Sequence, residues 1–161
     1  MRVSVTLRWS EFAEQAPKLA QRGRERLFQF GPGLAFLATV RGDGGPRLHP
    51  LCVNIVDGGL FILVVNSPKR ADLARDGRFA LHCFPPADND DEFYLTGQAV
   101  RIESPEAIAR VEQAQRESGA TTAGDEWLFE LHIERALYSQ YKTRGDPDYW
   151  PPVYFKWSAD R

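Results

Sequence analysis

Apolar residues near the N-terminus recur at helical spacing, and the pattern changes to short apolar runs after residue 33. Ser10 is a favoured N-cap residue, and Gly23 suits a C-terminal cap. This pattern predicts an amphipathic helix over residues 10–22, followed by a second short helical segment over 24–30. The apolar positions of the first helix are Phe12, Ala16, Leu19 and Ala20.

Two Asp-Gly turns divide the next segment into three short strands. The turns are Asp43-Gly44-Gly45 and Asp57-Gly58-Gly59, and each lies between apolar runs. Such spacing is typical of β-hairpins, so an antiparallel meander is expected. Its predicted strands cover residues 34–40, 47–56 and 60–65.

The rest of the chain alternates short helices with strands. Pro68 is well placed in a first helical turn, Ser104 is a second N-cap, and Gly97 predicts a bulge inside a strand. The expected order is a helix over 68–77, strands over 79–84 and 92–103, a helix from 104 to about 118, and a long sixth strand over 126–142.

Five or six strands in this order predict a mainly β fold, an antiparallel barrel of meander or Greek-key type with peripheral helices. Closure removes the exposed edges that an open sheet would present. We expect one domain over residues 1–161, with the barrel at about 34–142. The aromatic tail over 143–161 is expected to cover one barrel mouth or to pack on a second subunit.

Charge and hydropathy exclude several classes of function. The net charge is −2 and the basic residues are dispersed, so neither nucleic acid nor an anionic membrane is an expected partner. No apolar stretch approaches the ~20 residues that cross a bilayer, and the N-terminus lacks the apolar region of a signal peptide. A cytoplasmic protein is expected.

The segment over residues 66–73 is a candidate phosphate site. It follows an apolar strand and begins a helix, where backbone N–H groups and the helix dipole favour an anion. Ser67 adds a hydroxyl donor, and Lys69 and Arg70 add positive charge. The alternative is an ordinary helix start with solvated basic side chains.

A second candidate stretch begins the preceding hairpin. Arg47 and His49 point to the same face of their strand because side chains alternate. If this strand pairs with the next one, Arg47 lies near Ser67 and Lys69. The alternative is a salt bridge from Arg47 to a carboxylate.

Other catalytic chemistries lack their motifs. The histidines His49, His82 and His132 show no metal-ligand spacing, so no metal site is expected. No serine lies in a nucleophile elbow, and neither a G-x-G-x-x-G fingerprint nor a P-loop is present.

Taken in order, these segments resemble the pyridoxamine 5'-phosphate oxidase-like family of FMN-binding split β-barrels. The similarity runs from about Leu34 to Ile102 and includes the R-x-H-P strand, the S-x-K-x-x-x-L helix and the long sixth strand. The run DNDDEFYLTGQAVRI resembles an uncharacterised bacterial subgroup. The resemblance implies a homodimer with FMN at the subunit interface.

The resemblance also implies site residues. Phosphate ligands are expected at Arg47, Ser67 and Lys69, with Arg70 as an addition. His49, Pro50 and Leu51 match the strand segment that lies along the flavin ring. Candidates from the partner chain, which would cover the other side of the ring, are Gln98, Trp127 and Trp150.

One departure from the family concerns the substrate. The true oxidase has an R-x-E-x-W type signature near its C-terminus, whereas this chain ends VYFKWSADR. Oxidation of pyridoxamine phosphate is therefore not expected, and the substrate stays open. We expect an FMN-dependent oxidoreductase in which the flavin ring carries the chemistry and no catalytic side-chain nucleophile is needed.

Three alternatives remain. The same barrel could hold a deazaflavin and act as a reductase. It could be a non-catalytic flavin-binding or haem-binding module, with His49 or His82 as the axial haem ligand. It could also be an interaction domain without a cofactor.

Overall fold

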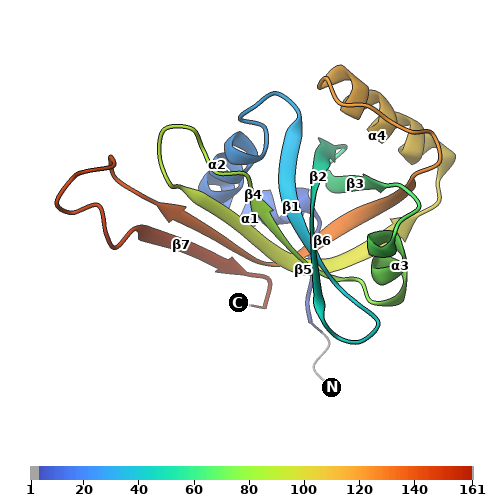
Figure 1. The fold of residues 1–161 in the computed structure, drawn as a ribbon, viewed down its shortest axis with the longest axis horizontal. Coiled ribbons are helices and arrows are strands. Elements are labelled where there is room, and N and C mark those ends of the chain that lie inside the picture. The colour runs from blue at the N-terminus through green and yellow to red at the C-terminus, as the bar shows by residue number, and fades with distance from the viewer. Residues whose placement is uncertain (1–3, 161) are drawn as a thin grey trace.

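A computed structural model describes residues 4–160 of the chain. Within them, seven strands form one sheet in the order β3-β2-β1-β4-β5-β6-β7, and antiparallel pairing of β3 with β6 closes the first six strands into a barrel (Figure 1). The strands are β1 Gly33–Val40, β2 Pro46–Val56, β3 Gly59–Val64, β4 Arg78–Cys83, β5 Glu92–Ile102, β6 Trp127–Gln140 and β7 Val153–Ser158. The expected antiparallel barrel is confirmed.

Strand β6 is shared between the barrel and an extension. Residues 127–130 pair with β3, whereas residues 135–140 pair with β7 along the same edge. The two strands and their connecting loop project from the barrel as an arm (Figure 1). The sequence pattern does not predict β7, because Pro151-Pro152 and a polar loop interrupt the alternation before it. The tail therefore extends the sheet by a strand.

The N-terminal helices differ from the expectation. The helix predicted over 10–22 is two helices, α1 Trp9–Gln15 and α2 Pro17–Leu27. Pro17 lacks the N–H that a continuous helix requires, and it begins α2 instead. Gly23 is not a cap but lies inside α2, where a Cβ atom would come within 2.2 Å of the Phe93 ring. No separate helix over 24–30 forms, because α2 continues to Leu27.

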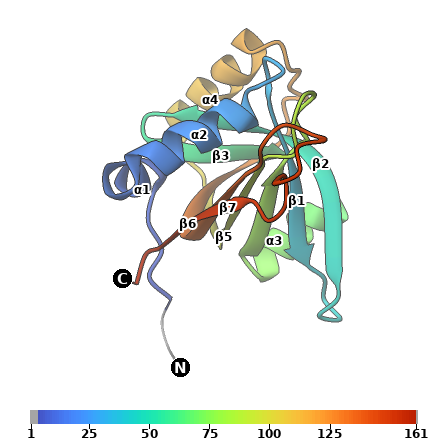
Figure 2. The same ribbon diagram turned by 90° about the vertical axis from the view of Figure 1, so that its left-hand side faces the viewer.

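Helices cover different sides of the barrel. Figure 2 shows α1 and α2 along one side and α3 (Pro68–Arg75) on the opposite side. The interior is filled by inward-facing strand residues such as Leu37, Leu81 and Leu131, and α1 adds Phe12. None of the helices described is long and apolar enough to cross a membrane.

Helix α4 (Pro105–Glu117) covers the face of β6 that carries Leu128 and Glu130. A second apolar cluster forms there from Phe61, Val111 and Leu128. Glu130 is consequently only 7% exposed, and its Oε1 accepts a hydrogen bond from Arg8 Nε at 2.6 Å. The predicted bulge is confirmed, since the β5–β6 register shifts at Gly97.

A buried carboxylate fastens the β4–β5 loop to β6. Asp91 accepts one hydrogen bond from the Tyr138 hydroxyl and one from the Tyr141 backbone N–H, both at 2.8 Å. Burial and the neighbouring Asp91 raise the pKa of Tyr138 to about 12. Because the pKa of Tyr138 is higher in the folded protein than its unfolded value of about 10, this hydroxyl contributes to the free energy of unfolding. The contribution is complete below pH 10 and is lost as the pH rises toward 12.

We therefore expect the free energy of unfolding of the wild type to fall by about 1 kcal/mol more than that of Tyr138→Phe between about pH 8 and pH 11. At neutral pH the variant should be less stable by about 1 kcal/mol, because Asp91 loses one donor. Urea titrations at both pH values measure these differences. An equal alkaline loss in both proteins would contradict the role of this hydroxyl.

Candidate functional site

The candidate site lies where the first half of β2 passes the start of α3. In the β1–β2 register, Arg47 lies opposite Thr39 and His49 lies opposite Leu37, both of which are buried. Arg47 and His49 therefore face the same, inward side of the sheet, as predicted. Leu51 follows them on that side, opposite Ala35.

A buried carboxylate on α3 holds Arg47. Asp72 is 3% exposed, and its Oδ2 accepts hydrogen bonds from Arg47 Nε at 2.7 Å and from the Thr39 hydroxyl at 2.9 Å. Its Oδ1 accepts a longer bond from Arg75 at 3.3 Å. Burial alone would raise the pKa of Asp72, but these hydrogen bonds outweigh it and hold the pKa below its usual value. Asp72 is therefore a carboxylate at neutral pH.

The way Asp72 binds Arg47 leaves part of the guanidinium available. The contact uses Nε, so the two terminal nitrogens keep their donors for another acceptor. The salt bridge that the sequence allowed as an alternative is thus present. It is compatible with anion binding, because it fixes the plane of the guanidinium.

His49 lies among positive charges. Burial lowers its pKa, Lys69 and Arg47 lower it further, and Asp72 opposes them. Its Nε2 is buried and has no hydrogen-bond partner among the described residues. The ring is therefore neutral at pH 7, and its buried Nε2 becomes accessible to a ligand only when a neighbouring side chain moves.

The start of α3 is not capped by a side chain. The N-cap residue Ser67 donates its hydroxyl to the Val65 carbonyl at 2.9 Å and makes no capping bond. Pro68 has no N–H, and the Arg70 N–H donates to the Ser67 carbonyl at 3.0 Å, so the Lys69 N–H is the backbone donor that the first turn leaves for an anion. Lys69, in this first turn, lies close enough to His49 to lower the histidine's pKa.

Arg70 points away from this group. Its guanidinium carbon is 4.5 Å from the centroid of the Trp127 ring, and its Nη1 donates to the Asp125 carbonyl at 3.2 Å. Arg101 approaches the same ring at 3.4 Å. The pairing of Trp127 with Val64 places this cation–π cluster close to Ser67 in the same chain.

Three other predicted residues lie apart from the group within one chain. Pro50 faces the outer side of β2, opposite to His49. Gln98 lies on β5, which β1 and β4 separate from β2 in the sheet. Trp150 is in the β6–β7 loop, where it is 67% exposed and 6.4 Å from the Tyr141 ring.

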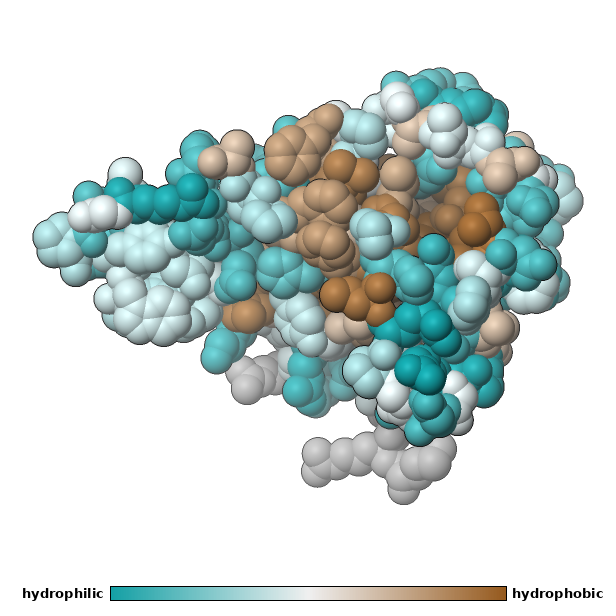
Figure 3. All heavy atoms as spheres, in the orientation of Figure 1, coloured by the Kyte–Doolittle hydropathy of each residue, from teal (hydrophilic) through white to brown (hydrophobic). Residues whose placement is uncertain are grey.

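The outer face of the sheet beside the site is apolar. Phe36 of β1 stacks on Phe84 at 4.4 Å, and in the register Pro50 and His82 flank it on either side. Leu48 of β2 is 65% exposed. Figure 3 shows apolar side chains gathered in the middle of this face, over β1 and the strands beside it.

Sequence patterns missed Asp72 and Thr39. Both are polar residues at inward positions, which hydrophobic alternation alone does not explain. The available signal was a single acidic residue in the otherwise basic helix PKRADLAR, five residues after Ser67.

Comparisons with known proteins identify the fold. A scan against protein families finds no match, and no curated protein sequence matches. Solved structures do match. A putative pyridoxamine 5'-phosphate oxidase from Listeria innocua has a TM-score of 0.58 at 15% identity, covering 72% of this chain and 94% of that one. The chain has the pyridoxamine 5'-phosphate oxidase-like split-barrel fold.

Other split barrels differ in what they bind. PhzG from Burkholderia lata, solved with tetrahydrophenazine-1-carboxylic acid, has a TM-score of 0.56 at 14% identity, over 92% of this chain and 93% of that one. A haem-binding protein from Mycobacterium smegmatis has a TM-score of 0.62 at 18% identity. That match covers 86% of this chain, which spans only 57% of the Mycobacterium chain. At such identities the likeness establishes the fold alone.

Proposed function

We propose that this split barrel binds FMN as a homodimer and serves as a flavin-dependent oxidoreductase. The observation that carries the proposal is the meeting of Arg47, His49 and Lys69 at the uncapped start of α3. Two cations and the Lys69 backbone N–H are donors suited to a phosphate, and His49 lies beside them. Asp72 offsets part of the charge, and it also orients Arg47.

The expected roles follow from these positions. Arg47 would offer its terminal nitrogens to the phosphate, and Lys69 would offer its ammonium group and its backbone N–H. The β2 segment from His49 to Leu51 would lie along the flavin ring. Arg70 is not in position to bind the phosphate unless it leaves Trp127.

The apolar outer face favours a second subunit. A sheet face that exposes Leu48 and the Phe36–Phe84 stack is typical of an interface, because monomers seldom expose large apolar patches. Because Arg47 and His49 face the inward side of β2, residues of a second copy on the outer face would reach the flavin around the edge of residues 46–53, which β3 leaves unpaired. Gln98 and Trp127 are the candidates for that contribution.

When bound, the flavin supplies hydride or electron transfer, and the protein binds it, orients it and limits solvent access to it. The substrate class depends on groups outside the phosphate seat. A deazaflavin cofactor has a tricyclic ring and a phosphate, as FMN does, so the same site could hold either. A competition experiment between the two cofactors shows which one the site prefers.

Calorimetric titration with FMN and with riboflavin tests the phosphate seat. The two ligands share the ring, and only FMN carries the phosphate. We expect FMN to bind at least about 100-fold more tightly, which corresponds to about 2.7 kcal/mol. Equal affinities, or binding of neither ligand, would refute the proposal.

The pH dependence of FMN binding should report on His49. A phosphate beside the ring adds negative charge among Lys69, Arg47 and Asp72 and raises the pKa of His49 from its lowered value in the free protein. A pKa that is higher in the complex means that binding takes up a proton. Affinity should therefore be greatest at low pH and decline as the pH rises through the pKa of the complex.

Titrations between about pH 5.5 and pH 8 in the wild type and in His49→Gln isolate this contribution. The second ionisation of the phosphate, near pH 6, affects both proteins alike. The ratio of wild-type to variant affinity should rise as the pH falls. Parallel curves would show that His49 does not face the phosphate.

A haem-binding module is the second candidate. The supporting observation is His82, which lies on the outer face beside Phe36, where a flat apolar ligand could pack. Its Nδ1 is 2.6 Å from the Cys83 carbonyl oxygen, and its Nε2, the nitrogen left for an iron, is 3.6 Å from the Glu92 carboxylate, which an iron would displace. A Soret band that is lost in His82→Ala would support haem, and an unchanged band would exclude His82 as the ligand.

A further inference from the structure

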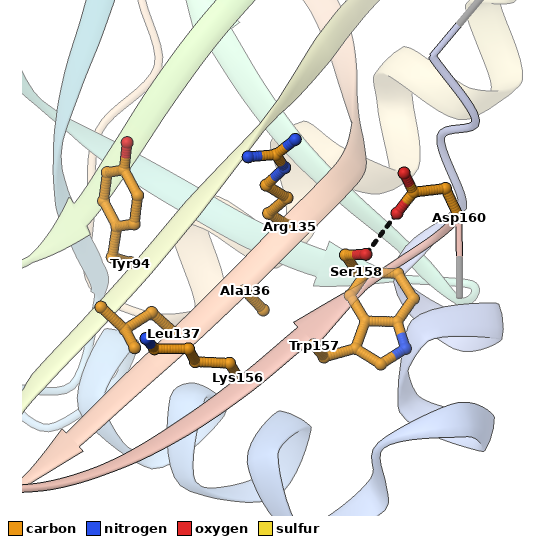
Figure 4. Close-up of a pocket in the computed structure, with 8 residues that line it drawn as sticks. All are labelled: Tyr94, Arg135, Ala136, Leu137, Lys156, Trp157, Ser158 and Asp160. Carbon is orange, nitrogen blue, oxygen red and sulfur yellow. Dashed lines mark hydrogen bonds between the residues drawn. The ribbon is translucent and has the colours of Figure 1, made fainter.

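A groove lies on the outer side of the sheet where β7 extends the barrel. It has a volume of about 400 Å³ and is built on β5, β6 and β7 (Figure 4). This volume falls in the range of small-molecule sites. In the strand order, β1 and β4 separate the groove from β2 and the phosphate seat, so it is a different place on the protein.

The strand register builds the groove from two rows of outward side chains. Tyr94, Leu137 and Lys156 lie opposite one another across β5, β6 and β7. Arg135 and Ser158 pair in the neighbouring row. The first row supplies apolar surface from a phenol ring and a leucine, and each row contributes one cation.

Ala136 and Trp157, which alternate with these outward residues, point to the inner side of the sheet and form the floor of the groove. Trp157 points toward the helices, where its indole N–H donates to Gln15 at 3.2 Å and its ring packs 4.9 Å from Phe12 (Figure 4). Ala136, its register partner, is buried. These contacts of Trp157 hold the edge strand β7 against α1, so the shape of the groove is fixed by packing.

The charge of the groove is positive by one unit. Arg135 and Lys156 contribute two positive charges, and Asp160, which accepts a hydrogen bond from the Ser158 hydroxyl, contributes one negative charge. The Arg135 side chain is 66% exposed, and among residues 4–160 the carboxylate within ion-pair distance of its Nε is that of Glu134, 4.0 Å away. At that distance no hydrogen bond holds it, so its donors are available to a ligand.

We propose that this groove binds a small organic monoanion with an apolar body, such as an aromatic carboxylate. A guanidinium binds a carboxylate through two parallel hydrogen bonds, and the Lys156 ammonium adds a point charge. The ring of Tyr94 and the side chain of Leu137 contact the body of the ligand. A net charge of one favours a monoanion over a phosphate dianion, and this inference does not depend on a bound flavin.

Calorimetry with naphthoate and its neutral amide tests the ligand class on the full chain. The two probes have the same shape and differ in charge. Naphthoate should bind with a dissociation constant between about 10 µM and 1 mM, and the amide at least about tenfold more weakly. Absence of naphthoate binding at about 1 mM, or equal binding of the amide, overturns the proposal.

Variants locate the binding. Arg135→Gln combined with Lys156→Gln should weaken naphthoate binding at least about tenfold, and both side chains are exposed, so the fold is preserved. Lys18→Gln with Arg116→Gln removes the same charge from two helices and should leave the affinity unchanged. An unaffected affinity in the groove variant overturns the proposal. So does a loss of binding in Arg47→Ala/Lys69→Ala, which would place naphthoate in the phosphate seat.

Discussion

Replacing Arg47 and Lys69 together with Ala should weaken FMN binding by about 100-fold or more. Each cation is expected to make a charge-assisted hydrogen bond with the phosphate, worth about 1.5–3 kcal/mol. Loss of both therefore costs at least about 3 kcal/mol, and each 1.4 kcal/mol is a factor of ten in the dissociation constant. Quenching of flavin fluorescence on titration measures the change.

Two controls accompany this variant, because Arg47 also has a structural partner. Its removal leaves Asp72 buried with fewer donors, so urea denaturation must show that the double variant still folds. Lys69→Ala alone spares that contact and should weaken binding by about tenfold. Lys18→Ala with Arg116→Ala removes the same charge elsewhere. If the double variant binds FMN as tightly as the wild type does, the proposed phosphate seat is refuted.

Leu48→Glu should convert a dimer into a monomer and abolish FMN binding with it. Leu48 is 65% exposed in the single chain, so the substitution does not disturb the core. In a two-fold interface the change occurs twice, and each charge would be desolvated without a partner. Several kcal/mol of dimer stability should be lost, which light scattering detects as a halved mass.

The matched control is Ala109→Glu, on the exposed side of α4. It adds the same charge to a helix and should leave both the mass and the FMN affinity unchanged. If Leu48→Glu remains dimeric, the outer face is not the interface. If it becomes a monomer that binds FMN as well as the wild type does, the site does not need a second subunit.

The barrel strands could be predicted because local signals agree with one another. Asp-Gly turns, alternation and the strand-forming runs all indicate the same boundaries, and the structure places β1, β2 and β3 within about a residue of them. The shared face of Arg47 and His49 followed from strand geometry alone. The number and order of the strands predicted a closed barrel, but not that β3 and β6 are the strands that pair, because no local pattern specifies a pairing so distant in sequence.

Other features depend on tertiary contacts that the sequence pattern does not contain. Pro17 by itself indicates a break in the N-terminal helix. That α2 continues past Gly23 depends on the Phe93 ring, which packs against Gly23. Arg70 carries the right charge for the phosphate site, yet the Trp127 ring attracts it elsewhere. Asp72 acts through a contact between α3 and β2 that only the fold brings together.

The decisive measurement is the visible absorption spectrum of the protein after it is mixed with FMN and passed through a size-exclusion column. If the split barrel binds FMN as a dimer, flavin elutes with the protein at the mass of a dimer, and its absorption bands are shifted from those of free FMN. Flavin that elutes alone, with the spectrum of the free cofactor, would contradict an FMN site in this split barrel.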